Sequence, residues 1–123
     1  MSELQARCKL WISRDVDSGV FGAGKMRLLQ AIQNTGSLRQ AAASLHMSYR
    51  KAWGDLKKAE TCMQMTLLEK TRGGRDGGHS VLTESGQRLV EAYQRYTDQV
   101  HHHMEQAFAT LMETMEPNGP QTE

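Results

Sequence analysis

The stretch that decides the fold is residues 37–60, which read SLRQAAASLHMSYRKAWGDLKKAE. It predicts one short helix over residues 38–45 and a second that begins after Ser48. The turn between them, His46 and Met47, is too tight for the helices of an ordinary bundle. The sequence therefore favours a compact, angled pair of helices.

Hydroxyl and small side chains support this pairing. Ser37 and Ser48 each stand just before a helix, where a side-chain oxygen can accept a hydrogen bond from a first-turn amide. Ala41 and Ala42 leave room for the second helix to approach the first. This is the pattern of a helix-turn-helix, whose second helix enters the major groove of DNA.

The second helix has one apolar face. Its apolar residues recur four, three and four positions apart, which is the spacing of a buried helical stripe. They are Ala52, Leu56, Ala59 and Met63.

Upstream of the pair, the sequence predicts a strand, a loop and a helix. Residues 7–13 alternate in polarity, which favours a short strand. Residues 15–24 are rich in Asp and Gly and are expected to form a loop whose Val20 and Phe21 dock on the core. Residues 25–35 carry apolar residues at helical spacing, and Gly36 is expected to end that helix.

Downstream of the pair, the sequence predicts a wing. Residues 67–71 and 80–82 read as two short strands, and residues 72–79 join them with a basic, glycine-rich loop. No lysine followed by Ser or Thr completes a phosphate-binding loop here, which argues against nucleotide binding. Two strands directly after the second helix make the helical pair a winged helix-turn-helix.

The last helix is expected to run from residue 83 to 115, with Pro117 beyond its end. Over that length it would extend about 50 Å, far more than a small winged domain can cover. Its apolar stripe therefore needs a partner, most simply a second copy in a two-fold dimer. The expected dimer-interface residues are Leu89, Tyr93, Tyr96, Val100, Met104, Leu111 and Met115.

The fold class that follows is mainly α, with a short N-terminal strand and a two-stranded wing. We expect a DNA-binding domain over residues 1–82, a dimerisation helix over residues 83–116 and a disordered tail over residues 117–123. Charge agrees with this division: residues 39–79 carry eight basic and four acidic side chains, whereas residues 80–123 carry two basic and seven acidic ones. A basic middle suits nucleic acid.

Several other functions are disfavoured. No apolar run reaches membrane length and no signal-peptide pattern opens the chain, so we expect a cytoplasmic protein without a membrane partner. Cys8 and Cys62 are too few for a disulfide framework or a zinc site. His101, His102 and His103 are adjacent, so on a helix they point about 100° apart and cannot share one metal ion. No catalytic constellation is present, and we expect no enzyme, no metal and no cofactor.

Short motifs of one recognisable combination run along most of the chain. They are Gly36-Ser37-Leu38, Ala41-Ala42, Met47-Ser48-Tyr49-Arg50-Lys51-Ala52-Trp53, Leu68-Glu69-Lys70-Thr71, Gly73-Gly74, Gly77-Gly78, Val81-Leu82-Thr83-Glu84-Ser85-Gly86, Leu89 and Tyr93. Together they resemble the N-terminal domain of ModE-type molybdate-responsive regulators. The resemblance covers roughly residues 7–115, and a looser similarity reaches the winged helix-turn-helix of LysR-type regulators.

The resemblance implies a homodimeric, sequence-specific transcriptional regulator of molybdate-uptake or molybdenum-cofactor genes. It also implies a C-terminal pair of small β-barrel domains that bind molybdate, and the sequence stops after the long helix. The DNA-binding role is therefore carried over, and molybdate binding is not. The alternative is an interaction module that pairs with another regulator through the long helix and modulates its DNA binding.

Three kinds of DNA contact are expected. Ser48, Tyr49 and Arg50 open the second helix and face the base edges, where Arg can bond guanine with two hydrogen bonds. Arg72 and Arg75 on the wing loop are expected to reach an adjacent minor groove or the backbone. The residues expected at phosphates are Ser37, Arg39, Lys51, Lys57 and Lys58.

Trp53 has two interpretations. It lies one position off the buried stripe of the second helix. From there it either flanks the DNA groove or packs beneath the wing.

Overall fold

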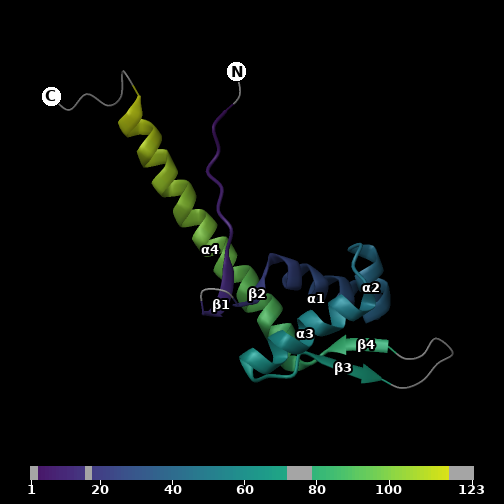
Figure 1. The fold of residues 1–123 in the computed structure, drawn as a ribbon. Coiled ribbons are helices and arrows are strands. Elements are labelled where there is room, and N and C mark those ends of the chain that lie inside the picture. The colour runs from purple at the N-terminus through teal and green to yellow at the C-terminus, as the bar shows by residue number, and fades with distance from the viewer. Residues whose placement is uncertain (1–2, 16–17, 72–78, 117–123) are drawn as a thin grey trace. The chain divides into compact units, whose positions relative to one another are not determined.

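The computed structural model describes residues 3–15, 18–71 and 79–116. Within them the chain forms four helices and two two-stranded antiparallel sheets, which confirms a mainly α winged helix-turn-helix (Figure 1). The elements are β1 (Trp11–Asp15), β2 (Ser18–Gly22), α1 (Ala23–Thr35), α2 (Leu38–Ser44), α3 (Tyr49–Met63), β3 (Leu68–Thr71), β4 (His79–Leu82) and α4 (Glu84–Met115).

The N-terminal region is a hairpin, which corrects two expectations. The strand lies at Trp11–Asp15 rather than 7–13, and the expected loop over 15–24 contains β2 and the start of α1. The glycines of β2 disguise its strand pattern in the sequence, but one of them has a packing role. A Cβ at Gly22 would lie 3.0 Å from the Cβ of Trp11, so a larger residue would crowd the pair.

The core contact of this hairpin is as expected. Val20 is 4% exposed and Phe21 is 1% exposed. The Phe21 ring meets the ring of Tyr93 edge-on, with centroids 5.0 Å apart. The Tyr93 hydroxyl also donates a hydrogen bond to the carbonyl of Leu10 at 3.0 Å, which fixes the start of the hairpin.

Local signals set the ends of α1, α2 and α3. Gly36 has a φ of 73°, and its N–H donates to the carbonyl of Ile32. A left-handed residue of this kind ends a helix, as the sequence predicts. The Ser37 hydroxyl accepts from the Gln40 amide at 3.1 Å, and the Ser48 hydroxyl accepts from the Lys51 amide at 3.0 Å. Both predicted N-caps are confirmed.

The turn between α2 and α3 is held by the backbone. His46 adopts a φ of 58°, and the Met47 amide donates to the carbonyl of Ala42 at 2.9 Å. Ala41, Ala42 and Ala52 are almost fully buried, so the two helices pack through small side chains. The angled pair predicted from the sequence is present.

The wing strands join the core through the backbone. Leu68 lies opposite Leu82, and Thr71 lies opposite His79. The Ser80 amide donates to the carbonyl of Gly36 at 2.9 Å. The predicted loop tip lies outside the described residues from position 72 to 78, so Arg72 and Arg75 are not placed.

Helix α4 begins against the wing. The Thr83 hydroxyl accepts from the Gly86 amide at 2.9 Å and so caps the helix. Gly86 is required there, because a Cβ at this position would fall 2.5 Å from the Leu67 carbonyl oxygen. Val90 and Tyr93 are buried, which anchors the first turns of α4 in the core.

Two compact units result. The first is Leu10–Tyr93, and the second comprises the described residues before Leu10 together with those from Gln94 onward. The expected boundary lies after residue 82, whereas the first compact unit extends into α4 as far as Tyr93. The expected tail at 117–123 lies outside the described residues. In the described part of the chain, no helix combines the length and hydropathy needed to cross a bilayer.

Candidate nucleic-acid interface

The N-termini of α2 and α3 are suited to anions. Both helices lie wholly within the described residues, and neither carries an acidic side chain in its first turn. The Ser37 and Ser48 hydroxyls each accept one amide hydrogen bond, and each keeps its own O–H to donate. These two predicted contact residues are therefore also the caps, and the free amides and helix dipoles favour phosphate nearby.

Arg50 is an exposed cation in the first turn of α3. Among the residues that the structure describes, it has no hydrogen-bond or ion-pair partner. Its side chain lies opposite the face that buries Ala52, Leu56 and Ala59 in the core. An unengaged guanidinium on the outward face of a helix can bond a guanine edge without breaking an internal contact.

Tyr49 is held by cations from two other elements. The Arg39 guanidinium of α2 lies 4.5 Å from the centre of its ring. The Lys70 ammonium of β3 donates to its hydroxyl at 3.1 Å. Tyr49 therefore ties α2, α3 and the wing together, and this contact leaves its hydroxyl only partly available to DNA.

Sequence reasoning missed Lys70. It shares a strand face with Leu68, since residues two apart on a strand point the same way. Leu68 is half-buried against the core, so this face turns inward and brings Lys70 toward α3. The period-two pattern of the strand was the signal that could have found it.

The predicted phosphate contacts differ in their surroundings. The Lys51 ammonium pairs with Asp55 at 2.9 Å, and the Lys57 ammonium pairs with Glu60 at 3.2 Å. An i,i+4 helix pair such as Lys51–Asp55 is worth about 0.3–0.5 kcal/mol, so a phosphate can displace it. In the second pair the lysine is exposed, but the Glu60 side chain is only 13% exposed. Lys58 is exposed and has no such partner among the described residues.

Glu60 joins α3 to the wing. Its carboxylate accepts hydrogen bonds from the Leu67 amide at 2.8 Å and the Leu68 amide at 3.2 Å. Burial alone would raise the pKa of Glu60, but these amides and the Lys57 ammonium outweigh it and lower the pKa below the ordinary value. The charged carboxylate thus holds Leu67 and Leu68, where β3 begins, against the helix.

Trp53 lines a cleft between α3 and β3 with a volume of about 290 Å³. Its side chain is 43% exposed, and the Lys57 ammonium lies 5.6 Å from its ring centre. Trp53 therefore borders a cleft that Leu68 and Lys70 of β3 also line, while part of its ring remains open to solvent.

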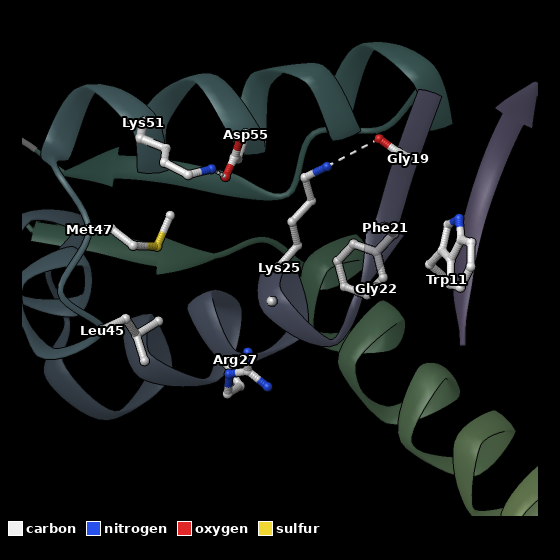
Figure 2. Close-up of a pocket in the computed structure, with 11 residues that line it drawn as sticks. Trp11, Gly19, Phe21, Gly22, Lys25, Arg27, Leu45, Met47, Lys51 and Asp55 are labelled. Atoms are coloured by element: carbon white, nitrogen blue, oxygen red, sulfur yellow. Dashed lines mark hydrogen bonds and ion pairs between the residues drawn. The ribbon is translucent and has the colours of Figure 1, made fainter. Parts of the chain in front are cut away.

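Lys25 is a cation that the sequence analysis did not select. It lines a pocket of about 460 Å³ beside Lys51 and Asp55, and its ammonium points toward the Gly19 carbonyl at 3.4 Å (Figure 2). Burial lowers the pKa of Lys25, and the charges of Lys58 and Lys51 lower it further, while Asp55 opposes them. The flank of α3 that carries Lys51 is therefore also positive.

The predicted interface residues of α4 fall into two groups. Leu89 packs against the core and Tyr93 is 5% exposed, so both serve their own unit. Of those in the second unit, Val100 and Met104 are half-buried. The exposed members are Tyr96, Leu111 and Met115.

No metal-ligand group of three or more His, Cys, Asp or Glu side chains is present in the described ranges. His102 and His103 place their ring centres 6.0 Å apart on α4.

The chain is similar to known regulators. It is 36% identical over 93 residues to the transcriptional regulator ModE of Haemophilus influenzae, covering 76% of this chain and 35% of that protein. It is 36% identical over 69 residues to the DNA-binding transcriptional dual regulator ModE of Escherichia coli strain K12, covering 56% of this chain and 26% of that protein. The chain thus spans about a quarter to a third of the length of these relatives.

A solved structure shows the same fold. The CbnR_DBD–DNA complex superposes with a TM-score of 0.55 at 20% identity, covering 72% of this chain and 95% of the other. The sequence pattern of the bacterial regulatory helix-turn-helix proteins matches residues 24–87, which is more than half of the chain. The helical pair, the wing and this match lead to one conclusion: the chain belongs to the lysR family of bacterial regulatory helix-turn-helix proteins.

Proposed function

We propose that this protein is a sequence-specific DNA-binding transcriptional regulator of ModE type that acts as a homodimer on a two-fold operator. The observation that carries the proposal is the first turn of α3. There Ser48 caps the helix, no acidic side chain intervenes, and Arg50 is exposed without an internal partner among the described residues. Such a turn can enter a major groove and read base edges.

The cations around this turn supply affinity without sequence preference. Arg39, Lys57, Lys58 and Lys70 surround the start and outward face of α3. Their contacts with phosphates would release counterions, so binding would weaken steeply with salt. Arg72 and Arg75 remain proposed wing contacts.

The dimer proposal is based on α4. Beyond Tyr93 its stripe exposes Tyr96 by 42%, Leu111 by 51% and Met115 by 66%. Large apolar side chains at helical spacing favour burial against another helix, and a two-fold axis would present two copies of α3 to two half-sites. The alternative partner is the long helix of another regulator.

The regulated genes are inferred from the relatives. One relative from Azotobacter vinelandii, 35% identical over 83 residues, is a molybdenum transport protein, ModE. We therefore propose that the operator controls genes of molybdate uptake or of the molybdenum cofactor.

The test uses the full chain and DNA selected by it from a random-sequence library. Arg50→Ala should weaken binding to the selected duplex by about 1–3 kcal/mol and relax the preference at one base position. Arg88→Ala is the control, because Arg88 is an exposed arginine that pairs with Glu84 on α4. Equal binding by the wild type and Arg50→Ala would refute base reading by Arg50.

The oligomeric state is measured in the same preparation. A homodimer predicts twice the mass of the chain in sedimentation equilibrium. A monomer that shifts DNA only when a second regulator is added would favour the interaction module instead.

A further inference from the structure

Gly54 lies in the middle of α3, and the fold gives no reason for a glycine there. Its backbone is helical, and apart from its chain neighbours and the backbone of its own helix, a Cβ at this position would meet no described atom within 4 Å. Gly36 and Gly86 differ, since the first needs a left-handed φ and the second has no space for a Cβ. Glycine costs a helix more conformational entropy than alanine does, so Gly54 destabilises α3, and no packing contact requires it.

The surroundings of Gly54 are cationic. Residues three and four positions away are its neighbours on a helix surface. They include Arg50 one turn before it, and Lys57 and Lys58 one turn after it, and all three side chains are exposed. The missing side chain thus leaves a gap in the outward face of α3, and exposed cations border this gap.

We propose that Gly54 is the point where a DNA sugar-phosphate strand comes against the backbone of α3. This inference rests on the proposed DNA-binding function. Lys57 and Lys58 would hold the phosphate, while Arg50, one turn nearer the helix start, remains directed to the bases. Glycine permits a close approach of this kind because it has no Cβ in the way.

Three features favour a phosphate over a base edge at this gap. The neighbours after Gly54 are lysines, which bind phosphates as point charges, and neither is an amide side chain of the kind that reads adenine. One further turn along, Thr61 is exposed on the same face, and its hydroxyl can donate to a phosphate oxygen. Recognition helices contact base edges mainly with their first residues, so side chains this far along α3 are better placed for the DNA backbone.

The test compares Gly54→Ala and Gly54→Leu with the wild type as full chains. The control is Gly24→Ala, because Gly24 is also exposed on a helix with no other described atom within 4 Å of an added Cβ. The probes are the duplex selected by the wild type and a scrambled duplex of the same length. Kd is measured for each, and thermal unfolding is recorded without DNA.

Gly54→Ala should raise the Tm by roughly 2–8 °C, because alanine favours the helix. It should nevertheless weaken binding to both duplexes by the same factor, about five- to a hundredfold, since a methyl group overfills the contact. Gly54→Leu should weaken binding further, and Gly24→Ala should leave both Kd values unchanged.

Three results would overturn the inference. Wild-type affinity in Gly54→Ala would show that no strand approaches this position. Weakening confined to the selected duplex would assign the gap to a base edge. A wild type that binds neither duplex would refute the proposed function, and this inference with it.

Discussion

The outward face of α3 and the apolar stripe of α4 beyond Tyr93 are both exposed, but they differ in how they are supported. The face of α3 is organised by contacts within its own unit: Ser48 caps it, and Tyr49 and Glu60 attach it to neighbouring elements. The stripe of α4 exposes Leu111 and Met115. This difference supports the proposal that the face of α3 can bind DNA without a contribution from a second chain, whereas the stripe of α4 would be half of an interface.

The largest expected effect comes from disrupting the apolar stripe of α4 beyond Tyr93. Leu111→Asp would place a charge in the apolar stripe, so the chain should sediment as a monomer. Loss of two-site binding should then reduce affinity for the selected duplex by about 10²- to 10⁴-fold. Sedimentation equilibrium and titration of labelled DNA measure the two effects.

The control for that variant is Gln106→Asp. Gln106 is exposed on α4, and at about 100° per residue it lies well away from the stripe. It should leave the mass and the affinity unchanged. A dimeric Leu111→Asp protein with wild-type affinity would contradict the proposal that the apolar stripe of α4 is a dimer interface.

A smaller effect is expected from weakening the internal support of α3. Because its amide and ammonium partners lower the pKa of Glu60, the charged carboxylate stabilises the fold above its unfolded pKa, near 4.5. That contribution is lost as the pH falls through the lower folded value. Glu60→Gln should cost about 1–3 kcal/mol near neutral pH and show less loss of stability on acidification.

Urea unfolding at neutral and acidic pH checks this prediction. Glu69→Gln is the matched control, because Glu69 is an exposed glutamate on β3. If both variants unfold like the wild type at every pH, the wing does not depend on Glu60.

The features that the sequence could predict are those set by residues close together in the chain. The caps Ser37 and Ser48, the stop at Gly36 and the buried stripe of α3 depend on residues within one turn of each other, so local patterns find them. The fold class follows from these elements and their order.

The features that the sequence did not predict involve contacts between residues far apart in the chain. Strand β2 pairs with β1, but its glycines conceal the strand pattern, and its Phe21 packs against Tyr93, which lies far along the sequence. Tyr93 reads as part of one long stripe, but the contact with Phe21 and Leu10 assigns it to the first unit. Lys70 reaches Tyr49 only once the wing is folded onto α3.

The most direct test of the central claim is the affinity of the wild-type chain for its selected duplex relative to the scrambled one, at physiological salt. A sequence-specific regulator predicts a ratio of about 10³ or more, with binding to both duplexes weakening as salt rises. Equal affinity for the two duplexes would contradict the claim, because the surface around Arg50 would then bind phosphates without reading bases.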